Sequence, residues 1–306
     1  MNPRTVPNSD DPPSADQSNL EAMVVEGVAY RASLAGADLT NAGLSSADLS
    51  GINLEGVNLT NADLTDADLA GVNLTGADLT DANLYRSSLT GADLTNADLS
   101  GADLTNASIR GATLRRSSLT GANLTNANLS GTDLTHANLT SADLSGADLT
   151  SADLSGANLY RANLTSVKLT NAALIGYNLS GVNLTGADLS NSDLSEANLC
   201  RAKLTGADLS NADMSRAGLR ATRLTGAILV SANLSGADMT KANMEGAHLP
   251  SVNLTGADLY CANLTNADLT NADLTNADLT GATLTNADIT GATLEGVKGW
   301  DTVKGL

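Results

Sequence analysis

Few side chains in this 306-residue sequence could act as nucleophiles, general bases or metal ligands. There are two histidines, His136 and His248, and two cysteines, Cys200 and Cys261. A cysteine nucleophile needs an adjacent base, and a zinc site needs three or four such ligands together. Acidic residues number 34, so pairs of carboxylates are inevitable and do not by themselves indicate catalysis. What these groups can do depends on where the fold places them.

The sequence repeats every five residues. From Leu34 to Leu294, each residue whose number ends in 4 or 9 is Leu, with a few Ile or Met exceptions. Two residues earlier stands Ala, or less often Val, Ile, Ser or Thr, and Tyr177 is the only large exception. Asp or Asn usually lies between them, and Gly or Asn is common two residues after the Leu. The repeating unit is therefore A-(D/N)-L-(T/S)-(G/N).

This period excludes an amphipathic helix. A Leu at every fifth position would advance about 140° per unit around a helix and face every direction. In an extended segment, by contrast, the Ala and the Leu point to one side and the Asp or Asn to the other. Gly and Asn tolerate the positive φ that many turns require, so the remaining two residues form a corner. Four such units make one closed coil, and about 13 coils stacked at ~4.8 Å give a rod about 60 Å long with a Leu and Ala interior.

Residues 34–294 resemble the pentapeptide-repeat family, through runs such as GADLTNADLSGADLTNA at 91–107 and NADLTNADLTNADLT at 266–280. This resemblance implies an all-β fold, a right-handed quadrilateral β-helix with the central Leu and the preceding small residue inside. Family members usually carry many Phe at the central position. This chain has none, so we expect a slimmer and more uniform rod.

The flanking segments lack the repeat. Residues 1–19 are rich in Pro, Ser and Asp, and we expect them to be disordered. Residues 20–33 should form an N-terminal cap, and residues 295–306 a C-terminal cap with Trp300 over the last Leu layer, because solenoid ends need covering. No apolar stretch suits a signal peptide or a membrane span, so we expect a bacterial, cytoplasmic protein with no membrane association.

On such a rod the reactive groups lie apart. The two histidines are about 112 residues apart, which is five or six coils. The two cysteines are about three coils apart, roughly 14 Å along the axis, beyond the ~7 Å Cα limit for a disulfide. The Asp side chains face solvent, and a filled interior leaves no substrate cavity. We therefore expect no catalytic residues, no metal and no cofactor, and the protein should not be an enzyme.

The outward columns are the remaining candidates, since residues 20 apart should stack. Asp38, Asp78 and Asp98 share one column, and Asp48 and Asp68 share another. These Asp columns are either ordinary solvated faces or part of a partner's footprint.

Apolar residues at outward positions are a second candidate. Ile228 and Val230 occupy slots that are mostly polar, and Pro250 stacks on Val230. They form either a neutral surface variation or a small contact patch. Basic residues fall into two sequence clusters, one at 201–223 (Arg201, Lys203, Arg216, Arg220 and Arg223) and one at 110–116 (Arg110, Arg115 and Arg116).

Two functions fit this pattern. The first is a non-catalytic scaffold that binds a protein partner through its outward columns. The second comes from the family resemblance: some members mimic duplex DNA and bind type II topoisomerases such as DNA gyrase, inhibiting or protecting them. A net charge of −18 disfavours direct binding to nucleic acid. Along its axis the repeat array carries roughly one net charge per ~4 Å, against one per ~1.7 Å in B-DNA. The sequence leaves the oligomeric state open.

The inward and outward assignment can be tested at neighbouring residues. Leu154→Asp would bury an unpaired charge in the apolar interior, so we expect it to lower the melting temperature strongly or prevent folding. Asp153→Asn exchanges one accepted outward residue for another and should change the melting temperature little. Equal destabilisation of the two variants by thermal denaturation would refute the assignment.

Overall fold

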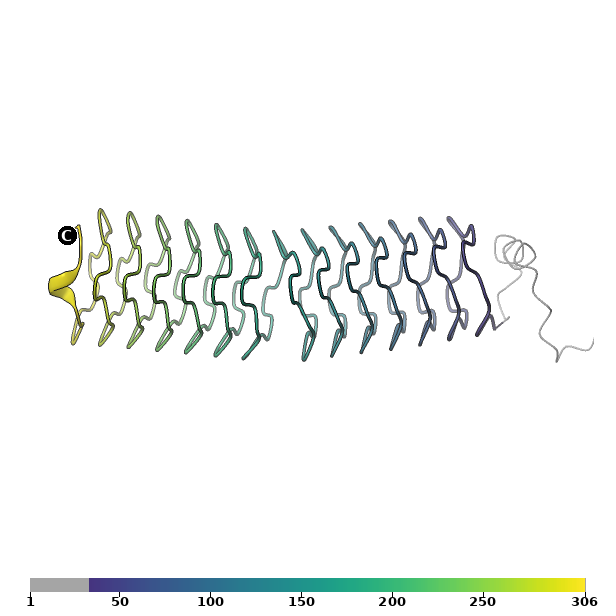
Figure 1. The fold of residues 1–306 in the computed structure, drawn as a ribbon, viewed down its shortest axis with the longest axis horizontal. Helices are drawn as coiled ribbons and strands as arrows, with labels where there is room; N and C mark the ends of the chain where they lie inside the picture. Colours follow the sequence, from purple (N-terminus) through teal and green to yellow (C-terminus); the bar gives the residue numbers. More distant parts are fainter. Residues whose placement is uncertain (1–32, 306) are drawn as a thin grey trace, which may run out of the picture.

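The computed structural model describes residues 33–305, which form one long rod of stacked coils (Figure 1). With two exceptions at the middle of the rod, parallel bridges pair the residue at the centre of each side with the residue 20 positions later, starting with Ser33 and Asn53. Only the final bridge, Thr283 to Lys304, spans one residue more. Four corners occur in every 20 residues, so the chain forms the predicted right-handed quadrilateral β-helix. The single helical element among residues 33–305 is the 3-10 helix η1, Trp300–Thr302. In this range, no helix is long and apolar enough to span a membrane.

Hydrogen bonds between successive coils hold each side in place. In one unit, the Leu39 N–H donates to the Asn58 carbonyl at 2.7 Å, and the Asn58 N–H donates to the Ala37 carbonyl at 2.9 Å. Only one residue per side makes a bridge because a corner follows two positions later. The sides are therefore isolated bridges rather than extended strands.

Each corner contains one residue with positive φ. From Gly36 to Gly296, every residue whose number ends in 1 or 6 has a φ in the left-handed region. The Ala42 N–H donates to the Leu39 carbonyl at 3.0 Å, which closes a four-residue turn with positive φ at its third residue, as in a type II turn. Gly and Asn accept this conformation readily. Larger residues at the same position, such as Arg201 with φ 59, adopt it at a cost of about 1–2 kcal/mol.

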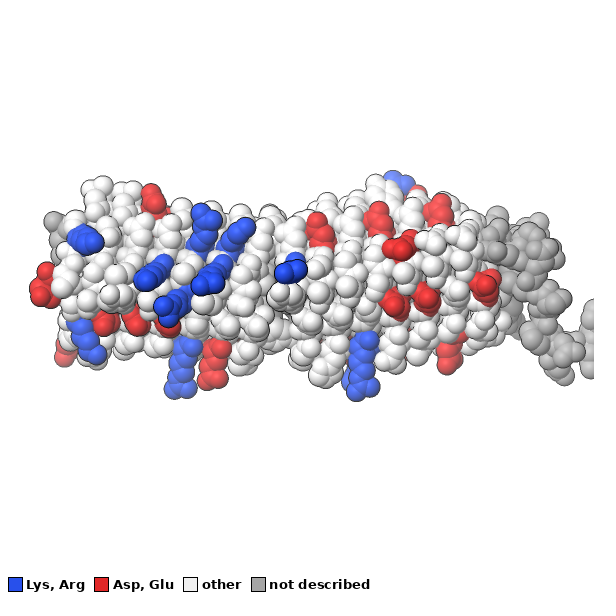
Figure 2. Space-filling model, in the orientation of Figure 1, with Lys and Arg blue, Asp and Glu red and all other residues white. Residues whose placement is uncertain are grey.

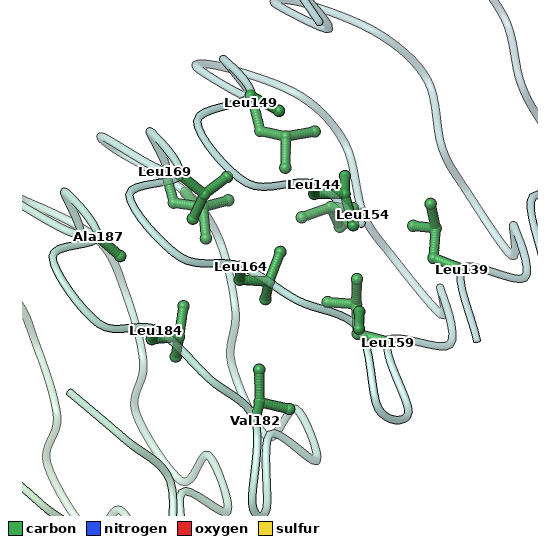
Figure 3. Close-up of a cluster of buried hydrophobic side chains, with 14 of the residues drawn as sticks. Leu139, Leu144, Leu149, Leu154, Leu159, Leu164, Leu169, Val182, Leu184 and Ala187 are labelled. Carbon is green, nitrogen blue, oxygen red and sulfur yellow. The ribbon is translucent and has the colours of Figure 1, made fainter. Parts of the chain in front are cut away.

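The interior is a column of Leu and Ala side chains, as the repeat predicts. Leu144, Leu164 and Leu184 follow one another along the rod and point into it (Figure 3), and each is at most 1% exposed. Five hydroxyl residues replace Ala in the buried small slot. Each donates to a backbone carbonyl, for example Ser87 Oγ to the Leu84 carbonyl at 2.8 Å, and no buried side-chain N or O atom of residues 33–305 lacks a hydrogen-bond partner.

At the C-terminal end, the chain leaves the repeat and turns through η1. Val297, Trp300 and Val303 are partly buried and pack against the end of the core. The assignment of 295–306 as a separate cap remains a prediction. The disordered tail predicted at 1–19 and almost all of the cap predicted at 20–33 lie outside the described residues.

The backbone ladder is interrupted once between residues 33 and 284. Figure 1 shows a wider spacing between two coils in the middle of the rod, within its teal region. The bridges that would start from Asp153 and Asn158 are both missing, whereas those from Asp148 and Asn163 are present. We call this interruption the break. The 20-residue register is the same on both sides of it. The unbroken repeat predicts continuous pairing along the rod, and the structure differs from that prediction here.

A single side chain accounts for the break. Tyr177 occupies the small slot that holds Ala in most repeats, and its hydroxyl reaches across to donate to the Leu154 carbonyl. A phenol ring cannot fit in a slot sized for Ala while neighbouring coils stay ~4.8 Å apart. The backbone groups that lose their usual ladder bonds are the N–H groups of residues 151, 154, 156, 159, 161, 173, 178 and 183.

Replacing Tyr177 with Ala should therefore stabilise the rod. The change restores the residue of neighbouring units and lets the eight missing backbone hydrogen bonds form, each worth about 1 kcal/mol. The half-buried ring contributes less than about 3 kcal/mol of apolar burial, which is lost. We expect a net gain of a few kcal/mol and a higher melting temperature, measured by circular dichroism. Ala237→Val, a change within an intact part of the array, is the control. A lower melting temperature for Tyr177→Ala would contradict this account of the break.

Candidate partner-binding surfaces

The outward Asp and Asn side chains have a structural role that the repeat alone did not indicate. Asp38 Oδ1 accepts a hydrogen bond from the Thr40 N–H at 3.1 Å and from the Thr40 hydroxyl at 2.5 Å. Asn58 makes the same two contacts with Thr60, at 3.0 and 2.7 Å. The N–H of this first corner residue has no place in the ladder between coils, so the side chain satisfies it.

These hydrogen bonds also hold the Asp groups ionised. For Asp38 and Asp78, the hydrogen bonds from the Thr side chain and then from its backbone N–H lower the pKa of the carboxyl below its ordinary value. Asn accepts the same bonds without a charge. Where Asp or Asn occupies this position, the corner uses its oxygen as an acceptor and does not need a negative charge there.

The structure stacks the predicted acidic residues as expected but divides them between two sides. Asp38, Asp78 and Asp98 lie in one column, with Asn58 between the first two, and all three Asp are exposed. Asp48 bridges to Asp68 in the second column, also exposed. Two corners and one complete side separate Asp38 from Asp48, so the two columns lie on opposite sides of the square rod.

The predicted apolar patch is brought together in space. Ile228 is 38% exposed at the centre of one side, and Val230 and Pro250 stack half-buried at the corner that follows it. His248 bridges to Ile228 from the next coil, and its Nδ1 lies 2.8 Å from Asp268. The patch is therefore small and bordered by a polar pair.

The basic residues form a surface that differs from the two sequence clusters. Figure 2 shows Lys and Arg side chains gathered on one face of the rod. Six of them lie at one corner and on the side that follows it: Arg161, Arg201, Lys203, Arg220, Arg223 and Lys241. We call these six residues the basic face. The outward positions of this corner and side carry no Asp or Glu from Tyr160 to Thr283.

None of the six has a salt bridge among the described residues, whereas other basic residues do. Arg216, which the sequence grouped with Arg201, lies at a different corner, where its guanidinium is 3.7 Å from Glu196. Arg115 is likewise within 3.8 Å of Asp133. The sequence signal that separates the basic face from these pairs is the position of each residue within its 20-residue coil.

The groups capable of chemistry stay apart, in the part of the chain that the structure describes. His136 lies at a corner and His248 on a side several coils away. Both cysteines are free thiols, and Cys200 Sγ contacts the Arg220 carbonyl at 3.3 Å. Among residues 33–305, no group of three or more His, Cys, Asp or Glu could hold a metal ion.

The break opens a cleft that the sequence did not predict. A cavity of about 200 Å³ is lined by residues from both of its coils, including Leu159, Tyr160 and Tyr177. A second cavity of about 290 Å³ lies beside it and is lined by Ser180, Gly181, Cys200 and Arg201. Ser180 borders both cavities, so the cleft leads from the break to the basic face.

Comparisons with known proteins place this fold. A family model described as Pentapeptide repeats matches in eight copies between residues 30 and 296. HetL, a pentapeptide repeat protein involved in heterocyst differentiation regulation from the cyanobacterium Nostoc sp. strain PCC 7120, is 33% identical, with 69% of this chain and 88% of HetL covered and a TM-score of 0.25.

Two further solved structures match. QnrB1, a plasmid-mediated fluoroquinolone resistance protein, is 21% identical, with 69% of this chain and 88% of that chain covered and a TM-score of 0.30. A pentapeptide repeat protein from the cyanobacterium Cyanothece 51142 is 30% identical, with 44% of this chain and 91% of that chain covered and a TM-score of 0.16. A search of curated proteins gives no match.

Substitution can separate the two roles of the outward Asp residues, which accept the corner N–H and carry negative charge. Changing Asp38, Asp78 and Asp98 together to Asn keeps the acceptor for the corner N–H, so the melting temperature at pH 7 should stay within a degree or two. Changing the same three to Ala removes the acceptor and should lower it by several degrees. Equal melting temperatures for the Asn and Ala variants would show that the corner bonds do not matter.

The same variants predict a pH dependence. The folded pKa values of Asp38 and Asp78 lie below the unfolded value of about 3.9. Their contribution to stability is therefore complete above that value and is lost as the pH falls through the folded pKa values. Between pH 5 and about pH 2, the wild type should lose more stability than the Asn variant. Parallel melting curves across this range would contradict the prediction.

Proposed function

The chain belongs to the pentapeptide repeat family, and on that premise we propose that it is a non-catalytic rod that binds a protein partner through its outward columns. The observation that carries this proposal is the segregation of charge on a rigid surface. Asp columns lie on the N-terminal coils, and the basic face lies on coils nearer the C-terminus. Apart from Tyr177, the interior of the described coils is filled by small and medium-sized side chains, mostly Leu and Ala, so the coils differ mainly on their outside.

Binding suits this surface better than catalysis. Neither cavity beside the break is lined by a His, Asp or Glu that could act as a general base. The Asp pKa values that are shifted are lowered by corner hydrogen bonds, for example at Asp78, which keeps these groups ionised rather than poised for proton transfer near neutral pH. Charged columns on a rigid solenoid are instead suited to electrostatic complementarity with a partner.

A second candidate is mimicry of duplex DNA toward a type II topoisomerase such as DNA gyrase. What favours it is the stacked, exposed Asp residues on opposite sides of the N-terminal coils, because a duplex likewise presents negative charge all around its axis. The basic face limits it to part of the rod, since the coils from Arg161 to Lys241 present positive charge on one face. A mimic of DNA would therefore use mainly the segment 38–103.

Affinity capture with matched surface variants tests the proposed function. The full-length protein is immobilised and exposed to a lysate of its source organism, and retained proteins are identified by mass spectrometry. Two variants are compared with the wild type: Asp38, Asp78 and Asp98 to Asn, and Ile228→Thr with Val230→Ser and Pro250→Thr. Both exchange residues for types that these slots already accept, so both should fold.

We expect a protein that the wild type retains in near-stoichiometric amount and that one of these variants retains at least about tenfold less. If wild type and both variants retain the same proteins, neither surface binds a specific partner. The topoisomerase candidate has its own arm: purified DNA gyrase in a supercoiling assay. If micromolar protein neither inhibits gyrase nor shields it from a quinolone, mimicry of DNA is wrong and the scaffold role stands alone.

A further inference from the structure

Two unusual features of the rod meet at one corner. The break lies between the coil that contains Leu159 and Arg161 and the coil that contains Asn178 and Ser180. Arg161 is also the first residue of the basic face, and the cavity lined by Ser180 and Arg201 joins the break to that face. The break and the basic face are therefore continuous parts of one surface.

The two edges of the break offer backbone groups in the spacing of a β-ladder. On one edge, the N–H groups of Leu159 and Arg161 lack the carbonyl partners that the corresponding residues of other coils have. On the other edge, the carbonyls of Asn178 and Ser180 lack the matching N–H donors. Alternate residues of an extended chain present donors and acceptors in this pattern, so such edges are templates for adding a strand.

The side chains around the break determine what charge such a strand must carry. Arg161, Arg201 and Lys203 have no carboxylate partner among the described residues, although the protein has a net charge of −18. Arg161 and Arg201 also hold left-handed corner positions, with φ values of 60 and 59, that Gly or Asn fills at most corners. Strained residues that persist without a structural partner point to a functional constraint. Tyr160, 57% exposed with the Arg161 guanidinium 5.1 Å from its ring centre, adds an aromatic contact.

We propose that the break and the basic face together bind an extended acidic segment of a partner protein. The segment's backbone pairs with the free N–H and carbonyl groups at the edges, and its carboxylates contact Arg161, Arg201 and Lys203. The proposal rests on the proposed function, a rod that binds a protein partner, and it names one surface and the chemistry of the partner.

The observations favour a peptide over a nucleic acid. Phosphate oxygens accept hydrogen bonds but cannot donate them, so a nucleic acid backbone would leave the Asn178 and Ser180 carbonyls without partners. The acidic coils that flank the basic face would also repel a long polyanion.

Fluorescence anisotropy with a defined probe tests the proposal on the full-length protein. The probe is a fluorescein-labelled peptide of five Glu-Thr repeats, which combines alternating carboxylates with a β-branched residue. Two comparison probes carry the same label: a peptide of five Gln-Thr repeats and a ten-nucleotide single-stranded thymidine oligonucleotide. Each is titrated at 50 and at 300 mM salt.

Three variants separate the backbone edges from the charges. Tyr177→Ala closes the break and leaves every charge in place, and Tyr177→Val, a residue also found in this slot, provides an independent closed form. Arg161→Ser with Arg201→Asn and Lys203→Asn removes charge and leaves the break open. The matched control is Arg110→Ser with Arg116→Asn, which removes basic residues from other columns. Circular dichroism verifies that each variant keeps its fold.

We expect the Glu-Thr peptide to bind the wild type and the control equally. Affinity should fall at least about tenfold in both closed variants, in the charge variant, and at the higher salt concentration. The Gln-Thr peptide and the oligonucleotide should bind at least about tenfold more weakly than the Glu-Thr peptide.

Four results would overturn the proposal: no binding of the Glu-Thr peptide by the wild type up to about millimolar concentration, undiminished binding by the closed variants, equal binding of the Gln-Thr peptide, or tighter binding of the oligonucleotide. Self-association of the wild type that the closed variants lose, measured by sedimentation, would identify a second copy as the occupant and would equally overturn it. Any of these results, combined with capture of a partner that depends on the Asp columns, would leave the proposed function intact and reject only this site.

Discussion

Every coil of this protein is positioned by backbone hydrogen bonds to the coils on either side, and the rest of the structure depends on that ladder. A side contributes only one bridging residue before the next corner. These bridges join residues that are 20 apart, except at Thr283 and Lys304, so the ladder sets the coil length at 20 residues almost throughout. The ladder and the corner turn use four of the five N–H groups in each unit, for example those of Asn41, Ala42, Asp63 and Leu64. In most units an Asp or Asn side chain accepts the fifth, as Asp63 does from the Thr65 N–H.

This constraint divides the sequence into residues that the fold dictates and residues that it leaves free. The Leu and Ala positions face a dry column and admit little besides similar apolar residues or a hydroxyl that reaches a carbonyl. At the outward centre of most sides a side-chain oxygen accepts the corner N–H, and Asp and Asn supply it equally well. A column that carries Asp rather than Asn, or an Arg at a corner that would favour Gly, is therefore not explained by the fold, and its charge is informative about partners.

Much of the architecture could be predicted because a five-residue period of Leu has few physical solutions. The direction of Leu154 and Asp153, the stacking of Asp38 with Asp78 and the absence of α-helix from residues 33–305 all follow from alternation in an extended chain interrupted by corners. The sequence also marked Tyr177 as exceptional, but not its consequence. Whether a stack absorbs one large side chain or opens around it depends on the spacing of neighbouring coils, which the repeat does not encode.

The basic face was missed for a different reason. Arg161 and Lys241 are 80 residues apart in the sequence yet occupy the same corner, while Arg216 is close to Arg201 in sequence and lies at another corner. Proximity along the chain is a poor guide in a solenoid, where position within the coil decides which residues share a face. The corner hydrogen bonds of Asp and Asn could not be predicted from the pattern either. They become evident only when the backbone ladder is known, because one N–H per unit then has no backbone acceptor.

The location of the break connects these observations. In a solenoid each coil contacts only its neighbours, so one weakened interface does not propagate and the coils on both sides keep their own stability. A ligand that enters this interface breaks no existing ladder bond, because Tyr177 already prevents those bonds from forming. Elsewhere in the rod, an inserted strand would first have to displace a full set of coil-to-coil hydrogen bonds, and the exchange would gain nothing. The interface beside the basic face is thus the place where backbone pairing with another chain adds hydrogen bonds that the fold itself leaves unmade.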